Sequence, residues 1–173
     1  DSGRHLLNTL NAVLNLSKLE AGEMKMTLEP VSLKAQAESM ADQLRPQADD
    51  ANLTLHLDTD PAPAKADPGG LQVAVRNLLS NAIKYTDAGG AVWVRTRMVD
   101  GTPVLEVEDN GIGMNPEQVP TLFAPFRQAS DGTSREYEGT GLGLAVTQRM
   151  IAEMDGTIDV DTKLGEGTCF TVR

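Results

Sequence analysis

Hydrophobic residues recur at helical spacing in four stretches of the chain, and this periodicity predicts four helices. The stretches are residues 3–21, 32–51, 68–86 and 142–154. Asp67 and Pro68 suit the start of the third helix, because Asp is a good N-cap and Pro fits the first helical turn. Pro46 lies inside the second stretch, where its missing N–H should kink or shorten the helix.

Other stretches alternate between hydrophobic and polar residues, which is typical of strands with one buried face. They are residues 53–58, 92–98, 104–109, 157–161 and 168–172. Leu53, Leu55 and Leu57 form the expected buried face of the first strand, and Asp100-Gly101 favours a hairpin between the second and third. Residues 23–31 are expected to form an extended connector, and 60–65 a loop. The pattern therefore predicts helices on one side of a largely antiparallel sheet.

Composition and charge narrow the classes of function. The 173 residues carry a formal net charge of −10, which argues against a nucleic-acid surface and against attraction to an anionic membrane. The single cysteine, Cys169, excludes an intrachain disulfide and fits a reducing compartment. We find no membrane-length apolar run and no signal peptide, so we expect a cytoplasmic chain. Because the sequence opens in mid-helix without methionine, we expect it to be part of a longer protein.

The stretch NLLSNAIKYT places polar groups on one face of the third predicted helix. Asn77, Asn81 and Lys84 share this face, because residues four and seven positions apart align on a helix. Carboxamide oxygens are ligands for Mg²⁺, and an ammonium group complements phosphate oxygens. On its own the pattern is more typical of a solvated helix face.

The stretch DNGIGM follows the third predicted strand. Asp109 is suited to accept a hydrogen bond from an exocyclic amine, and Gly111 and Gly113 allow positive φ and close approach of a ligand. The alternative is an ordinary Asp-Asn-Gly turn.

The stretches LFAPF and GTGLGL flank a polar loop, residues 127–139. Phe123 and Phe126 are expected to form a hydrophobic plug beneath this loop, whose length favours a functional role. The glycines at 139, 141 and 143 precede a helix and predict a phosphate cradle made of backbone N–H groups. No strand leads directly into these glycines and GK[ST] is missing, so neither a Rossmann fingerprint nor a Walker A loop is indicated.

Taken in order, NLLSNAIKYT, DNGIGM, LFAPF and GTGLGL resemble the N, G1, F and G2 boxes of the ATP-binding domain of sensor histidine kinases. KLGEGT resembles a trailing G3-like turn. The wider group includes gyrase, Hsp90 and MutL-type ATPases. The resemblance covers roughly residues 30–173, and residues 126–146 look most like the hybrid kinases, which also carry receiver domains. The opening helix resembles the second helix of the dimerisation and phosphotransfer bundle, so the expected division is 1–22 bundle helix, 23–31 linker and 32–173 catalytic domain.

This resemblance implies a two-layer α/β sandwich: a mixed, mostly antiparallel sheet of about five strands on three helices, plus an N-terminal helix. It implies ATP and Mg²⁺ as ligands, with Asn81 binding the metal and Asn77 assisting. Asp109 would recognise the adenine amino group, with Thr168 touching adenine through water, and Arg135 would reach the γ-phosphate. The residues implied to contact ATP are Asn77, Asn81, Lys84, Tyr85, Asp109, Gly111, Gly113, Phe126, Gly139, Thr140, Gly141, Leu142, Gly143, Leu144 and Thr168.

The resemblance also separates kinases from ATPases. ATPases of the wider group carry a glutamate as general base four residues before the metal-binding asparagine, where this chain has Asn77. The implied function is a kinase domain that donates the γ-phosphoryl group to a histidine. A His followed by an acid and a proline is absent from the 173 residues, so we expect no autophosphorylation of this chain. Implied partners are a bundle histidine in the same or the sister subunit, a response-regulator receiver domain and a second copy of the parent protein. The alternatives are a clamp-type ATPase and a non-enzymatic nucleotide-binding module.

Overall fold

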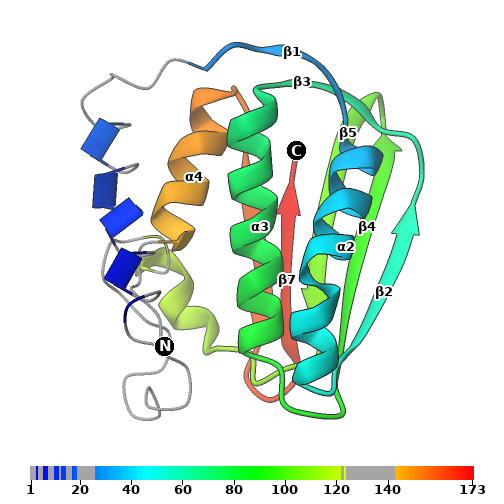
Figure 1. Ribbon diagram of the computed structural model, residues 1–173, viewed down its shortest axis with the longest axis vertical. Helices are drawn as coiled ribbons and strands as arrows, with labels where there is room; N and C mark the ends of the chain where they lie inside the picture. Colours follow the sequence, from blue (N-terminus) through cyan, green and yellow to red (C-terminus); the bar gives the residue numbers. More distant parts are fainter. Residues whose placement is uncertain are drawn as a thin grey trace.

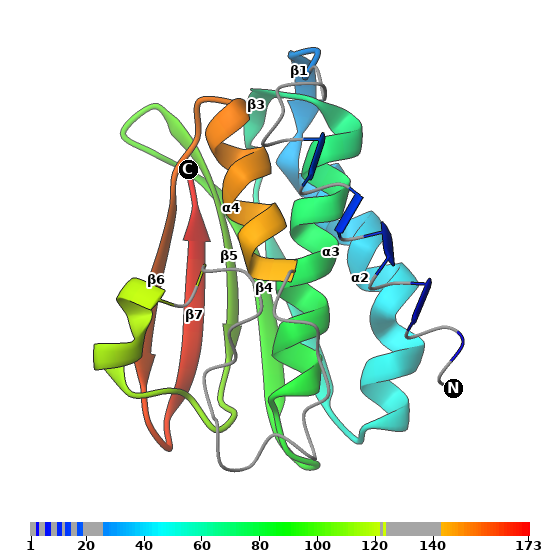
Figure 2. The same ribbon diagram turned by 90° about the vertical axis from the view of Figure 1, so that its left-hand side faces the viewer.

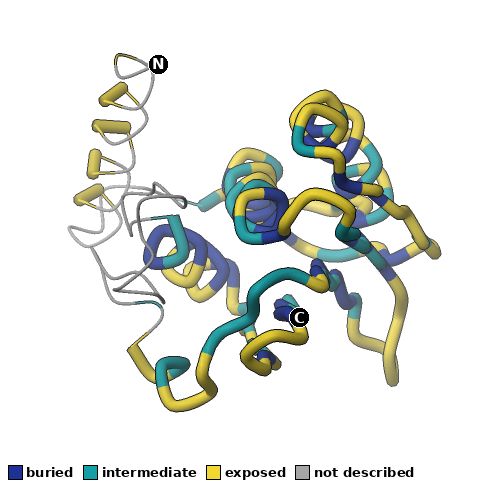
Figure 3. The backbone as a smooth tube through the Cα atoms, turned by 90° about the horizontal axis from the view of Figure 1, so that it is seen from below, coloured by how far each residue is buried: buried dark blue, intermediate teal, exposed yellow. Residues whose placement is uncertain are grey.

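A computed structural model of the chain describes residues 26–121, 123 and 143–173. Nine further residues between 3 and 18 are also described, and they are helical. The leucines and the valine among them lie on the outside of the molecule, with exposed fractions from 39% for Val13 to 69% for Leu6 (Figure 3). Within the part of the chain that the structure describes, no helix has the length and apolar character needed to cross a membrane.

The centre of the fold is a five-stranded mixed sheet with the strand order β2-β4-β5-β7-β6. Its strands are β2 (Thr54–Thr59), β4 (Ala91–Val99), β5 (Thr102–Asp109), β6 (Ile158–Lys163) and β7 (Gly167–Val172). Only the β2–β4 pair is parallel, and the other pairs are antiparallel. The hairpin between β4 and β5 turns at Asp100 and Gly101, whose φ values of 50° and 80° fit the tight turn that this dipeptide predicts.

Three helices form the second layer: α2 (Leu33–Asp50), α3 (Pro68–Lys84) and α4 (Gly143–Glu153). They lie side by side over one face of the sheet, with α3 between the other two (Figure 1). Figure 2 shows the two layers edge-on, with α2, α3 and α4 on one side of the sheet and the short helix η1 (Pro116–Thr121) beside the edge strand β6. The core between the layers is apolar and includes Leu78 and Leu79 of α3 and Val92, Val94 and Val107 of the sheet, all fully buried. The predicted two-layer α/β fold with a mixed five-stranded sheet is therefore confirmed.

The start of α3 is fixed by Asp67. Its side chain accepts hydrogen bonds from Gly70 N (2.8 Å) and Thr27 N (2.9 Å), so the predicted N-cap also holds the segment that precedes β1. These N–H groups stabilise the carboxylate and lower the pKa of Asp67, with the Gly70 N–H contributing most.

Two local expectations were wrong, and the shortening of α2, expected as one of two effects of Pro46, does not occur. Residues 60–65 were expected to be a loop, yet β3 (Pro63–Ala66) pairs antiparallel with β1 (Glu29–Ser32) in a separate two-stranded sheet. Prolines weaken a strand pattern but are tolerated in such an edge ribbon. Pro46 does not shorten α2, which continues to Asp50 because Leu44 and Ala48 on either side are buried. Leu57 is 37% exposed, since β2 is an edge strand.

Candidate nucleotide site

Three residues spaced one turn apart on α3 organise the candidate site. Asn77, Asn81 and Tyr85 are half-buried, as expected for a face that borders a site rather than the core. Asn77 contacts the first turn of α4, and the carbonyl of Tyr85 accepts a hydrogen bond from Ile112 N (3.1 Å) in the glycine loop. Asn81 lies between these two contacts, one turn from each. The helix therefore brings together three motifs that are far apart in sequence.

Asn77 anchors α4. Its amide nitrogen donates to the carbonyl oxygen of Gly143 and to Thr147 Oγ1, both at 3.1 Å. The Thr147 hydroxyl itself donates to the Gly143 carbonyl at 2.8 Å. Because these bonds use the amide nitrogen, the side-chain oxygen of Asn77 is the atom available to a ligand. A glutamate at this position could not donate to the Gly143 carbonyl, which gives a structural reason for an asparagine here.

Replacing Asn77 with alanine should destabilise the fold. Loss of two partly buried hydrogen bonds between α3 and α4 is expected to lower the free energy of unfolding by about 1–2 kcal/mol. Urea unfolding of Asn77→Ala measures this change. Gln72→Ala is the matched control, because it removes an exposed carboxamide from the same helix. Equal stabilities of the two variants would contradict the anchoring role.

The glycine loop after β5 is held by backbone contacts. Gly113 has a φ of 62°, as predicted, and a Cβ there would overlap the carbonyl oxygen of Lys163. Gly111 does not adopt positive φ. It is required because a Cβ would overlap the Tyr85 carbonyl oxygen. The close packing of backbone segments therefore already requires glycine at both positions, without the expected approach of a ligand. Gly165 N completes the contacts by donating to the Ile112 carbonyl (2.8 Å).

Asp109 is a buried carboxyl group at the end of β5. It is 6% exposed and accepts a hydrogen bond from Gly111 N at 2.9 Å. Burial raises the pKa of Asp109 to about 6, although the backbone N–H groups of Gly111 and Thr168 lower it in part. None of the ion pairs among the described residues includes Asp109. At neutral pH the site therefore holds a buried negative charge that forms no ion pair within the described residues and can accept a hydrogen bond from a ligand N–H group.

A cavity of about 530 Å³ lies beside this loop. It is lined by the turn after α3, by the start of the glycine loop and by the β6–β7 turn, namely Asp87, Ala88, Gly90, Asn110, Gly111, Ile112, Leu164 and Gly165. The cavity therefore borders the residues that directly follow Asp109 in the chain.

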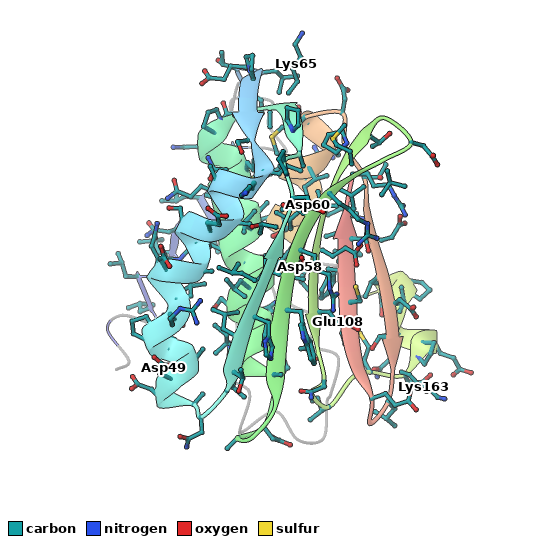
Figure 4. All side chains as sticks on the ribbon, turned by 90° about the vertical axis from the view of Figure 1, so that its right-hand side faces the viewer. Asp49, Asp58, Asp60, Lys65, Glu108 and Lys163 are labelled. Carbon is teal, nitrogen blue, oxygen red and sulfur yellow. The ribbon has the colours of Figure 1, made fainter. Side chains whose placement is uncertain are left out.

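The face of the sheet without helices carries different chemistry. His56 stacks on Trp93 with ring centroids 5.5 Å apart, and Arg95 lies over the same indole. Arg95 also pairs with Glu108 at 2.8 Å, and Figure 4 shows Glu108 and Asp58 on this side. His56 is therefore an exposed residue on the opposite face of the sheet from Asp109.

Cys169 is half-buried on β7. Burial, together with smaller contributions from Glu106 and Glu108, raises the pKa of its thiol to about 11. The thiol is protonated at neutral pH, as expected for a structural cysteine rather than a nucleophile.

The structure places several of the remaining predicted residues and leaves others outside its description. Lys84 is exposed in the last turn of α3, and burial raises the pKa of the half-buried Tyr85. Leu144 packs against the core, and Phe123 contacts Phe170 edge-on with centroids 6.5 Å apart, as expected for one half of the plug. Phe126, Arg135, Gly139, Thr140, Gly141 and Leu142 lie outside the described residues.

Sequence reasoning missed two buried threonines of this region. Thr147 contacts Asn77 from α4, and Thr162 contacts Thr168 from β6. The signal in the sequence that could have identified Thr162 is a polar residue at a core-facing position of a strand. This signal can be interpreted only once the register of β6 and β7 is known.

Comparison with known proteins gives one family match. A family model described as "Histidine kinase-, DNA gyrase B-, and HSP90-like ATPase" matches residues 66–173. This range includes α3, the glycine loop, α4 and the strands from β4 to β7.

Similar proteins are sensor kinases. The chain is 36% identical to the circadian input-output histidine kinase CikA of Synechococcus elongatus, over 99% of the chain and 23% of that protein. It is also 36% identical to the sensor histidine kinase RcsC of Escherichia coli, over the whole chain and 18% of that protein. The crystal structure of full-length ShkA in complex with AMPPNP matches with a TM-score of 0.86 and 31% identity, over 99% of this chain and 36% of that one. The chain thus spans less than a quarter of either curated relative.

Proposed function

We propose that this chain, which belongs to the family of histidine kinase-, DNA gyrase B- and HSP90-like ATPases, binds Mg-ATP and donates its γ-phosphoryl group to a histidine. The chain is an ATP-binding kinase module of the sensor histidine kinase type. The transfer to histidine, the metal and the residue roles are the proposal. They are supported by one observation above all: Asp109 is a buried carboxylate that has no cationic partner among the described residues, beside a loop bound to the end of α3.

The geometry of the described residues supports the proposed roles. Asp109 recognises the adenine amino group, because a buried carboxylate needs a donor and has only backbone N–H groups in the described residues. Thr168 lies directly across from Asp109 in the β5–β7 pair, on the same face of the sheet. The nucleotide then extends along α3 toward Asn81, with its phosphates near the start of α4. The sequence motif GTGLGL ends there, and a helix N-terminus favours anions.

Mg²⁺ fits Asn81 together with the phosphates. Among the residues that the structure describes, no group of three or more His, Cys, Asp or Glu side chains could hold a metal ion. Mg²⁺ commonly takes one or two protein oxygens and completes its shell with phosphate oxygens and water. The Asn81 carboxamide, with Asn77 assisting through its side-chain oxygen, would supply the protein oxygens. The ion would neutralise charge on the transferring phosphoryl group.

The phosphoacceptor is proposed to be a histidine outside these 173 residues. His56 is stacked on Trp93 on the wrong face of the sheet, and His5 lies outside the described residues. The further partners we propose are a receiver domain and a second copy of the parent protein, as the sensor-kinase relatives suggest. The proposed location of the domain is the cytoplasm.

Asn81→Ala tests the metal role. We expect its affinity for ATP in Mg²⁺ to fall by about tenfold or more, whereas its affinity in EDTA should remain within about threefold of wild type. Calorimetric titration measures both, with Gln72→Ala as the control carboxamide on the same helix. If Asn81→Ala weakened binding equally with and without Mg²⁺, Asn81 would not be the metal ligand.

A measurement of steady-state phosphate release distinguishes the proposed kinase domain from the alternative, a clamp-type ATPase. The kinase assignment predicts slow or no turnover of ATP by the chain alone, because Asn77 cannot act as a general base. Sustained hydrolysis that is lost in Asn77→Ala would favour a clamp-type ATPase instead.

A further inference from the structure

Buried polar side chains form a row across the helix-covered face of the sheet. Asp109 on β5 pairs with Thr168 on β7, and Thr168 pairs with Thr162 on β6. Residues directly opposite in neighbouring strands point to the same face, so the three side chains are adjacent. Their exposed fractions are 6%, 7% and 8%. Asp109 and Thr168 belong to the proposed nucleotide site, whereas Thr162 has no role assigned so far.

The Thr162 hydroxyl is fully engaged. It accepts a hydrogen bond from Met114 N at 3.0 Å, at the end of the glycine loop. It also lies 3.1 Å from the carbonyl oxygen of Gly167 and 2.9 Å from Thr168 Oγ1. A hydroxyl has one proton to donate and two lone pairs with which to accept. These three partners therefore use the whole hydrogen-bonding capacity of the Thr162 hydroxyl.

The direction of each hydrogen bond follows from this inventory. The Gly167 carbonyl can only accept, so the proton of Thr162 is directed to it. Thr162 then has no proton left for Thr168, and the Thr168 hydroxyl must donate to Thr162. The lone pairs of Thr168 are left as acceptors for its other neighbours. In this arrangement every member of the network is satisfied, as buried polar groups require.

Two adjacent groups therefore offer only acceptors to a ligand. The ionised Asp109 carboxylate accepts, and Thr168 accepts because its proton is held by Thr162. An exocyclic amino group, directly or through a bridging water, complements this pair. A carbonyl oxygen in the same place would face lone pairs with no proton between them, and an unmatched polar group in a buried site is costly.

We propose that Thr162 is a positioning residue that fixes Thr168 as a hydrogen-bond acceptor and so favours 6-aminopurine over 6-oxopurine nucleotides. The proposal rests on the nucleotide site proposed above and adds a residue that determines its selectivity. Thr162 acts through Thr168 and through the Met114 end of the glycine loop, and it does not itself contact the base.

The test compares ATP with inosine triphosphate, which differs from ATP at the 6-position by carrying an oxo group. Affinities are measured by calorimetry in Mg²⁺ for wild type, Thr162→Val and Thr162→Ser, and Thr162→Ala replaces the valine variant if that variant does not fold. Thr96→Val is the matched control, because Thr96 is a buried sheet threonine that donates to Asp60 O at 2.8 Å. The stability of each variant is recorded by thermal unfolding.

We expect wild type and Thr96→Val to show the same preference for ATP. Thr162→Val should reduce the ratio of the two affinities by about tenfold, because Thr168 regains a proton that it can offer to an oxo group. Thr162→Ser keeps the hydroxyl and should restore the ratio. If Thr162→Val weakened both nucleotides equally, or left the ratio unchanged, the inference would be overturned and the nucleotide site would stand. If wild type bound neither nucleotide, the proposed function itself would fail.

Discussion

Asp109→Asn should lose ATP binding and gain stability at the same time. The ionised carboxylate accepts from the adenine amino group in the proposed complex, and a hydrogen bond to a charged group is worth about 1.5–3 kcal/mol. The affinity for ATP is therefore expected to fall by about 100-fold. Calorimetric titration at pH 7.5 measures the loss. Glu108→Gln is the control, because Glu108 is the neighbouring acid and lies on the opposite face of the sheet with Arg95.

The gain in stability follows from the raised pKa of Asp109. Its folded-state pKa of about 6 lies above the ordinary value of 3.8, so the folded protein binds more protons than the unfolded chain between these values. The contribution of Asp109 to stability therefore falls as pH rises from 3.8 to 6, and above pH 6 the full cost of burying the charge remains. Asparagine removes this cost.

We expect Asp109→Asn to raise the free energy of unfolding by about 1–3 kcal/mol at pH 7.5, and by much less at pH 4. Urea unfolding at the two pH values measures the difference. A variant that was less stable than wild type at pH 7.5 would show that Asp109 is held for structure rather than for a ligand.

Gly167→Ala should have the largest effect on folding. Gly167 has a φ of 115°, a region that side chains disfavour, and a Cβ there would overlap the carbonyl oxygen of Asp109 and lie 2.9 Å from Asn110 Cα. Both contacts are with backbone at the β5–β7 pair, which cannot move without displacing Asp109. We expect the free energy of unfolding to fall by about 3 kcal/mol or more.

Gly165→Ala measures the cost of a side chain at positive φ without the steric overlap that Gly167→Ala also introduces. Gly165 belongs to the same turn and has a φ of 83°, but a Cβ there has nothing within 4 Å. Its substitution should cost only about 1–2 kcal/mol. Thermal and urea unfolding of the two variants measure the contrast. If both alanine variants were equally stable, the overlap of a Cβ at Gly167 with Asp109 would make no contribution to the free energy of unfolding.

The pattern of hydrophobic residues along the chain was sufficient to predict the helix layer and the sheet layer of this fold. The heptad-like spacing of α3 and the alternation of β4 and β5 depend on local periodicity, so their boundaries agree with the sequence to within about two residues. The β1–β3 ribbon could not be predicted, because its strands are four residues long and contain prolines. The conformation of these strands depends on pairing between segments that lie more than 30 residues apart in the sequence.

The candidate site was predictable in part. The shared face of Asn77 and Asn81 follows from helical spacing alone, and both residues are half-buried on α3. That Asn77 anchors α4 could not be foreseen, because Gly143 and Thr147 are more than 60 residues away. Thr162 was missed for the same reason: its importance depends on the register between β6 and β7.

The central claim is that this chain binds Mg-ATP in the site bordered by Asp109 and Asn81. Calorimetric titration of the unmodified chain with ATP in the presence of Mg²⁺ tests it most directly. We predict saturable binding of one nucleotide per chain, weakened when Mg²⁺ is removed and lost in Asp109→Asn. The absence of saturable binding by the unmodified chain, or equal binding by Asp109→Asn, would contradict the claim.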